Sequence, residues 1–229
     1  MKAALKFYVY IIALTSLVSC RSLSEIPRYK FSDGEYLYHQ KDDDYQSVYI
    51  ENKLEEEEDT ILIYPAAKAY TPVFPEIRPA QDQFFLKHSF HLNILTVLFK
   101  YRPSIEGFPS QLNSNINGAL FFGYRVDKFQ VRYSATPAGW KNEVLHWGLS
   151  AGVFGGFGST PITPWTTNYR TMDEYNGFVF SRGFAVMGSL NRLTVGVGVG
   201  LDYLADRDKD IWIHQNKAWY GLTLGLNLN

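Results

Sequence analysis

The chain from residue 193 to residue 204 alternates between large apolar side chains and small or polar ones. Leucine, valine and tyrosine occupy the odd positions from 193 to 203, whereas threonine, three glycines and aspartate occupy the even positions up to 202. Because successive side chains of a β-strand point to opposite faces, this alternation predicts a strand. One face should meet an apolar environment. The glycine face should leave room for larger side chains on neighbouring strands.

Similar patterns after residue 84 predict further strands and the turns between them. We expect strands at 89–101, 117–125, 128–135, 143–157, 175–190 and 217–229. Val126-Asp127 and Asn191-Arg192 are interpreted as tight turns that close hairpins. Segments 102–115 and 205–216 are interpreted as long connections, and 136–142 as a connection of medium length.

The lengths of the connections indicate one more strand. A bacterial outer-membrane barrel has an even number of strands and alternates long loops with short turns. That alternation fails at 158–173 unless the segment contains a further strand, which we place within 159–169, although Pro161 and Pro164 are poor members of a ladder. The predicted fold is therefore all-β, an antiparallel transmembrane β-barrel of eight strands over residues 84–229.

A membrane barrel explains the alternation because its apolar face meets lipid while small and polar side chains fill the lumen. An eight-stranded lumen is only wide enough for side chains. The glycines at 196, 198 and 200 should make room for larger inward residues from other strands, such as Arg132, His146 and Phe154. A soluble β-barrel or sandwich, with the apolar face turned inward, is the alternative. The polar residues expected in the lumen are His91, Asn93, Arg132, His146, Ser150 and Asp202.

The first twenty residues predict export and lipidation. Residues 1–19 combine two lysines with an apolar run at 7–17 that is too short to span a bilayer, which is typical of a signal peptide. The run ends in Leu17-Val18-Ser19-Cys20, which resembles the lipobox of bacterial lipoproteins. Cys20 is the only cysteine of the chain and has no internal disulfide partner, so we expect it to carry the lipid. Arg21 follows it, rather than the aspartate that retains lipoproteins at the inner membrane, which favours the outer membrane.

Between the lipid anchor and the barrel we expect three segments. Residues 20–28 are interpreted as a lipidated tether, and 66–83, with three prolines, as an extended linker. Residues 29–65 predict a small charged β-module outside the membrane, with strands at 34–40, 46–52 and 59–65. The acidic runs between these strands lack the ligand spacing of an EF-hand and are interpreted as solvated turns.

Several stretches resemble a family of small outer-membrane β-barrel lipoproteins of unassigned function. The resemblance covers most of the chain after the signal peptide and implies the same fold and location, but it transfers no catalytic or ligand residues. The stretches that carry it are FKYRP (99–103), QLNSNINGALFFGYR (111–125), WGLSAGVFGGFGSTPITPW (147–165) and WIHQNKAWYGLTLGLNLN (212–229), with DGEYLYHQ (33–40) and DTILIYP (59–65).

The sequence assigns no catalytic residue, cofactor or metal ligand. His146 and Ser150 share a face and suggest a hydrolase acting on outer-membrane lipid. However, four residues along a strand separate them by about 13 Å, at about 3.3 Å per residue, which is too far for a hydrogen bond. The net charge of −1 gives no electrostatic case for binding nucleic acid.

The function that we expect is a non-enzymatic structural or interaction role in the cell envelope, performed by a lipid-anchored outer-membrane barrel. The alternatives are a lipid-modifying barrel enzyme and a narrow pore. An even strand count returns the chain to its starting side, so residues 29–65 should face the periplasm and meet a protein or cell-wall partner there. The expected partners are therefore outer-membrane lipid and this periplasmic component.

Overall fold

The computed structural model describes residues 31–40, 45–54, 59–65, 82–105, 107–137, 139–191 and 193–227. The expected signal peptide, Cys20, the tether and most of the linker lie outside the described residues. The ten strands of the described part are β1 (Gly34–Gln40), β2 (Gln46–Leu54), β3 (Asp59–Pro65), β4 (Gln83–Arg102), β5 (Gln111–Asn113), β6 (Asn117–Thr136), β7 (Gly139–Ile162), β8 (Tyr175–Leu190), β9 (Leu193–Leu204) and β10 (Ala218–Asn227). Two short 3-10 turns, η1 (Trp165–Thr167) and η2 (Arg207–Asp210), complete the regular structure.

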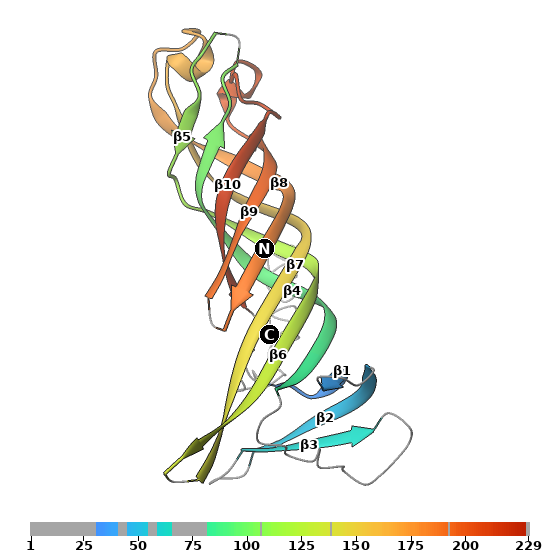
Figure 1. Ribbon diagram of the computed structural model, residues 1–229. Helices are drawn as coiled ribbons and strands as arrows, with labels where there is room; N and C mark the ends of the chain where they lie inside the picture. The colour runs from blue at the N-terminus through green and yellow to red at the C-terminus, as the bar shows by residue number, and fades with distance from the viewer. Residues whose placement is uncertain are drawn as a thin grey trace, which may run out of the picture.

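All ten strands belong to one antiparallel sheet, in the order β10-β9-β8-β7-β6-β4-β1-β2-β3, with the short β5 on β4 (Figure 1). β10 also pairs with β4, from Tyr220 opposite Tyr101 to Asn227 opposite Asn93. The pairings of β4, β6, β7, β8, β9 and β10 therefore return to their starting strand. We call these six strands the ring strands. The all-β, antiparallel fold expected from the sequence is confirmed.

The ring contains six strands rather than the eight expected, and two errors account for the difference. Val126-Asp127 is not a turn, because β6 continues through it and pairs with β4 on one side and β7 on the other. The strand expected within 159–169 does not form either. Its first residues extend β7 as far as Ile162, and η1 follows. Each error added one strand to the expected count.

The strands β1, β2 and β3 occupy the positions expected for the charged module, but they continue the main sheet. β1 pairs with the start of β4, from Leu37 opposite Leu86 to Gln40 opposite Gln83. Apolar side chains of β1 and β2 pack against side chains near the start of β4 and in the second half of β6. We call this buried cluster the basal core. Its residues are Phe31, Tyr36, Val48, Ile50, Phe85, Phe129 and Val131.

The connections of the ring differ in length between its two ends. Three long connections, at 103–116, 163–174 and 205–217, lie at the end that is uppermost in Figure 1. Two short turns, near 137–138 and 191–192, lie at the other end with β1–β3. Segment 136–142 was expected to be a loop of medium length at the same end as the long loops. Because β6 is one continuous strand, this turn falls at the opposite end instead.

Candidate functional site

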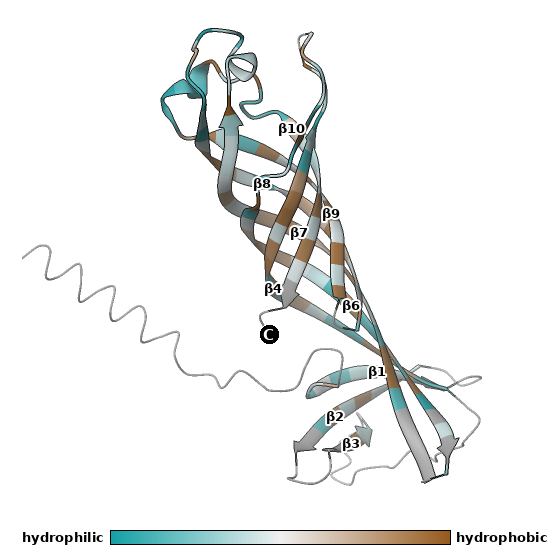
Figure 2. Ribbon diagram, turned by 90° about the vertical axis from the view of Figure 1, so that its left-hand side faces the viewer, coloured by the Kyte–Doolittle hydropathy of each residue, from teal (hydrophilic) through white to brown (hydrophobic). Residues whose placement is uncertain are grey.

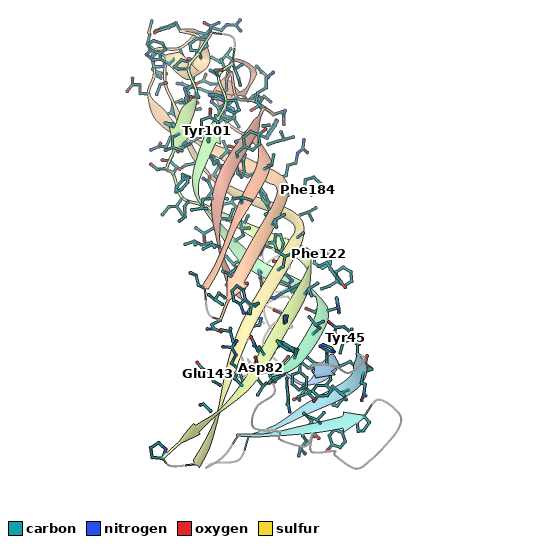
Figure 3. All side chains as sticks on the ribbon, viewed as in Figure 1. Tyr45, Asp82, Tyr101, Phe122, Glu143 and Phe184 are labelled. Carbon is teal, nitrogen blue, oxygen red and sulfur yellow. The ribbon has the colours of Figure 1, made fainter. Side chains whose placement is uncertain are left out.

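The outer face of the ring strands carries a continuous set of exposed apolar and aromatic side chains, which we call the apolar belt. In Figure 2 the apolar segments gather on the ring strands, whereas the upper loops are largely hydrophilic. Figure 3 shows Phe122 and Phe184 projecting away from the sheet, and Phe184 is 70% exposed. The belt comprises Phe90, Leu92, Ile94, Leu120, Phe122, Tyr124, Trp147, Leu149, Val153, Phe157, Phe178, Phe180, Phe184, Val186, Leu190, Leu193, Val195, Val197, Val199, Tyr203 and Tyr220.

β9 shows the predicted alternation. Its large apolar residues Leu193, Val195, Val197, Val199 and Tyr203 are exposed, whereas the intervening positions from 194 to 202 are buried or half-buried. From Leu193 to Tyr203 the belt face of this strand covers 11 residues. A tilted β-strand needs about 9–11 residues to cross the hydrocarbon core of a bilayer.

The belt ends where the ring meets the basal core. On β6, Leu120, Phe122 and Tyr124 point outward, but farther along the same strand Phe129 and Val131 point inward and are buried against β1 and β2. On β6 the exposed apolar side chains of the belt thus end at Tyr124, and the buried apolar side chains beyond it face β1 and β2. This exchange sets the edge of the belt next to β1–β3.

A buried charge cluster occupies the inner face near the long loops, centred on Asp202 of β9. Its carboxylate accepts hydrogen bonds from Lys100 Nζ at 2.9 Å and from Arg102 Nη2 at 2.5 Å. It also accepts bonds from the Ser181 hydroxyl and from Trp219 Nε1, at 2.7 and 2.9 Å. All five side chains are buried. Two cations therefore share one carboxylate in a dry environment, where an unpaired charge is costly.

The inward direction of Lys100 and Arg102 depends on an irregularity in β4. Up to Val97 the odd residues of β4 face inward, but from Lys100 onward the even residues do so. Phe99 lies opposite Leu222 of β10 and Val97 opposite Thr223, so Leu98 is an extra residue in the ladder. A bulge of this kind turns the following side chains to the other face. It brings two basic residues to Asp202.

The long connection 205–217 covers this cluster. The guanidinium of Arg102 lies over the Trp212 ring, 5.2 Å from its centroid. His214 Nε2 is 3.1 Å from the side-chain oxygen of Gln111 on β5. Burial, followed by the positive charge of Arg102, lowers the pKa of His214 to about 4. His214 is therefore neutral at physiological pH, which avoids a third positive charge next to Lys100 and Arg102.

Large apolar side chains fill the middle of the ring. The buried cluster consists of Leu95, Val97, Ala119, Phe121, Phe154, Ala185, Met187 and Trp219. Glycines on β9 make room for it, as expected, although their partners differ in part. A Cβ on Gly196 would lie 2.6 Å from Met187 and one on Gly200 would lie 2.5 Å from Trp219, whereas one on Gly198 would make only an ordinary contact with Phe154, at 3.5 Å. Side chains, rather than a channel, thus occupy this level.

A second charge cluster lies on the inner face near the short turns. Asp127 of β6 accepts a hydrogen bond from Arg125 Nε at 2.7 Å and lies 2.6 Å from His146 Nε2 of β7. Arg125 Nη1 and Nη2 and His146 Nδ1 are buried without a hydrogen-bond partner among the described residues. The structure thus pairs a histidine with a carboxylate. Ser150, in contrast, bonds to the carbonyl of Met187 at 3.5 Å, so the described residues contain no serine nucleophile on His146.

Five of the six polar residues expected in the lumen are buried on the inner face, namely His91, Asn93, His146, Ser150 and Asp202. Arg132 is the exception. It points outward and pairs with Asp82 at the surface, because the continuous β6 keeps its even residues on the outer face. The sequence reasoning missed Lys100, Arg102 and Asp127. The run KYR (100–102) next to a loop was the one available signal for the first two.

Comparisons with known family models, with characterised proteins and with solved structures yield no match. Within the described part of the chain, no helix has the length and hydropathy needed to cross a membrane. The described histidines and carboxylates do not gather in groups of three that could hold a metal ion.

Proposed function

We propose that this protein is a lipid-anchored outer-membrane β-barrel with a non-enzymatic structural or interaction role in the envelope. The apolar belt is the observation that carries the proposal. Burying one large apolar side chain is worth about 1.5–3 kcal/mol. A continuous belt of some twenty such residues in water would therefore be strongly unfavourable, and surfaces of this kind mark membrane or protein interfaces.

The inner face of the ring is consistent with a transmembrane barrel. Its polar groups are buried inside the ring, and the ladder pairs the backbone groups of each ring strand with two neighbours, as hydrocarbon requires. Six strands are fewer than the eight of the small bacterial barrels. A narrower interior needs smaller side chains, which agrees with the glycines at 200, 183 and 196, where a Cβ would clash with Trp219, Phe154 and Met187 respectively.

Arg182 of β8 is a charged side chain on the belt face. It is exposed and lies opposite Leu201 of β9. Leu201 is two residues before Tyr203, so Arg182 lies near the end of the belt that adjoins the long connections. A long arginine side chain near a membrane boundary can extend its guanidinium to the headgroups while its aliphatic part stays in the apolar layer. Its position accords with a membrane boundary close to Tyr203.

The proposed orientation places β1–β3 in the periplasm and the three long connections outside the cell. Both ends of the ring chain, at Gln83 and Asn227, lie at the end with the short turns, as the even strand count requires. Cys20 precedes this end by about sixty residues. A lipid on Cys20 in the inner leaflet would then hold β1–β3 close to the periplasmic surface, where a protein or the cell wall could bind them.

Three alternatives receive less support from the geometry. A lipid-modifying enzyme would need a nucleophile on the His146–Asp127 pair, and Ser150 does not supply it. A pore would need a passage through the level filled by Phe121, Phe154 and Trp219. The soluble alternative requires the apolar face to turn inward, which is the opposite of the exposure of the belt.

The protein has two proposed modes of membrane attachment, the lipid on Cys20 and the inserted belt, and one experiment distinguishes them. Residues 1–20 are replaced by a cleavable secretory signal peptide without cysteine, and membranes of the producing cells are washed with alkaline carbonate. We expect the unlipidated chain to stay in the membrane pellet, because its belt is inserted. Release into the wash would show that the lipid alone held the protein and would contradict the barrel.

The lipid itself is tested on the unaltered leader. Metabolic labelling with a fatty-acid probe should label the native chain and leave the Cys20→Ser variant unlabelled. Equal labelling of both chains would contradict the assignment of Cys20.

A further inference from the structure

A polar groove of about 410 Å³ opens at the end of the ring that carries the long connections. It lies between β5 with the two residues that follow it and the end of β7 with η1, which adjoin one another in Figure 1. Neither the belt nor the two charge clusters contribute a lining residue. The groove is lined by Gln111, Leu112, Asn113, Ser114, Asn115, Pro161, Thr163 and Thr166.

The lining groups are neutral. Three carboxamides and three hydroxyls supply both donors and acceptors, and Leu112 and Pro161 supply apolar contact. A charged ligand would find no counter-ion in this lining. A neutral ligand with many hydroxyl groups would meet both donors and acceptors in this lining.

Hydrogen bonds to the interior fix the floor of the groove. Asn113 donates to the Thr160 hydroxyl at 3.1 Å, and the same hydroxyl accepts a bond from Arg102 at 2.9 Å. The side-chain oxygen of Asn113 also accepts the backbone N–H of Asn115 at 2.8 Å. The carboxamides are thus held in place before a ligand arrives, which reduces the entropy lost on binding.

Two aromatic rings are exposed on the connection that forms one wall. Trp165 and Tyr169 are 56% and 51% exposed, and their ring centroids lie 5.6 Å apart. Trp165 stands in η1 between Thr163 and Thr166, which both line the groove. Tryptophan and tyrosine combine a large apolar face with a polar edge, and the apolar face of a sugar ring can stack on such a surface.

The backbone at this wall is strained. Asn168 and Tyr169 are consecutive and have φ values of +54° and +57°. The left-handed region is uncommon for a bulky side chain, and residues held there cluster at ligand-binding and active sites.

We propose that the groove and the Trp165–Tyr169 pair form a binding site for a neutral glycan. The amides and hydroxyls of the groove hydrogen-bond the sugar hydroxyls, and the aromatic pair stacks on a sugar ring. The site is independent of membrane insertion, although the orientation proposed above would place it on the cell surface.

Calorimetric titration of the purified full chain tests the site. A detergent without a sugar headgroup avoids competition, and near-ultraviolet circular dichroism checks the fold of each variant. The probes are the neutral malto-, cello- and mannohexaose and hexa-N-acetylchitohexaose, with hexagalacturonate as a charged oligosaccharide of similar length. We expect at least one neutral hexasaccharide to bind with a Kd below about 1 mM. Heat from none of them, or from hexagalacturonate alone, would overturn the proposal.

Three variants locate the binding. Trp165→Ala and Asn115→Ala should each weaken it by about tenfold or more, since each removes a contact to the sugar. Met172→Ala, at a position 74% exposed on the same connection but outside the groove, should leave the Kd unchanged. Binding that is insensitive to Trp165→Ala and Asn115→Ala would also overturn the proposal. A non-inserting chain that still binds would leave it standing, so the site and the barrel are tested separately.

Discussion

Gly200 of β9 leaves the space that the indole of Trp219 occupies. A Cβ atom at Gly200 would lie 2.5 Å from Trp219 Cζ2 and 3.0 Å from the backbone carbonyl of Arg182. The two residues lie directly opposite each other in the ladder between β9 and β10. With this space free, the indole can donate its hydrogen bond to Asp202 and lie beneath the Lys100 ammonium, which is 4.7 Å from a ring centroid.

Gly200→Ala should therefore destabilise the protein. The extra methyl group cannot be accommodated without shifting the indole or the Arg182 backbone, and overpacking of this kind costs about 1–3 kcal/mol. Gly188→Ala on β8 is the matched control, because a Cβ there meets nothing within 4 Å. We expect the control to be neutral or stabilised by less than about 1 kcal/mol. Urea unfolding in lipid vesicles measures both, and equal values would contradict the packing.

Asp202→Asn should cost more than the loss of either of its basic partners. It leaves Lys100 and Arg102 buried without a counter-charge, and removing one partner of a buried ion pair typically costs about 3–5 kcal/mol. Lys100→Met leaves one cation facing one carboxylate, so its loss of unfolding free energy should be smaller. If Lys100→Met is the more damaging of the two, the shared-carboxylate description is wrong.

His214 should make stability depend on pH. Its pKa is about 4 in the folded protein, compared with 6.5 ordinarily, so the unfolded chain binds the proton more tightly. The folded state therefore loses stability as the pH falls from about 6.5 to 4, by up to about 3 kcal/mol at about 1.4 kcal/mol per pKa unit, and is unaffected above this range. His214→Gln should flatten the pH profile of the unfolding free energy between pH 4 and 6.5. Identical profiles for both chains would rule out His214 as the cause.

The sequence allows the strand faces to be predicted far better than the strand count. Alternation alone gave the outer and inner faces of β9, because apolar and glycine residues differ so clearly there. The turn expected at Val126-Asp127 was wrong because Asp127 belongs to one continuous strand. In the fold it lies inside, paired with Arg125 and with His146 on another strand.

Contacts between distant strands also explain the rest of the site that was missed. The bulge at Leu98 turns Lys100 inward, and its partner Asp202 lies 102 residues along the chain. No local sequence pattern predicts such a pair. Arg132 was assigned to the inner face because β6 was expected to be two strands. In the single continuous strand, Arg132 lies on the outer face.

The corrected topology predicts which segments are accessible from outside the cell. Tags inserted at 41–44, near the turn at 137–138 and in the connection 205–217 are compared by protease shaving of intact cells. We expect loss of the tag at 205–217 alone, because β1 and β2, between which the first tag is inserted, and the turn between β6 and β7 lie at the periplasmic end of the ring in the proposed orientation. Loss of the 137–138 tag would contradict the single continuous β6, and loss of the 41–44 tag would reverse the orientation of β1–β3.

The central claim, that the apolar belt faces lipid, is tested most directly by Val197→Arg. Val197 is 64% exposed and lies near the middle of the belt face of β9. Tyr49→Arg on β2 serves as the control, because Tyr49 is exposed outside the belt. The measurement is the free energy of unfolding in phospholipid bilayers. An arginine near the bilayer midplane of a barrel costs about 2–4 kcal/mol, so Val197→Arg should lose this amount, whereas Tyr49→Arg should change by less than about 0.5 kcal/mol. Equal and small changes for the two variants would show that Val197 faces water and would contradict the account.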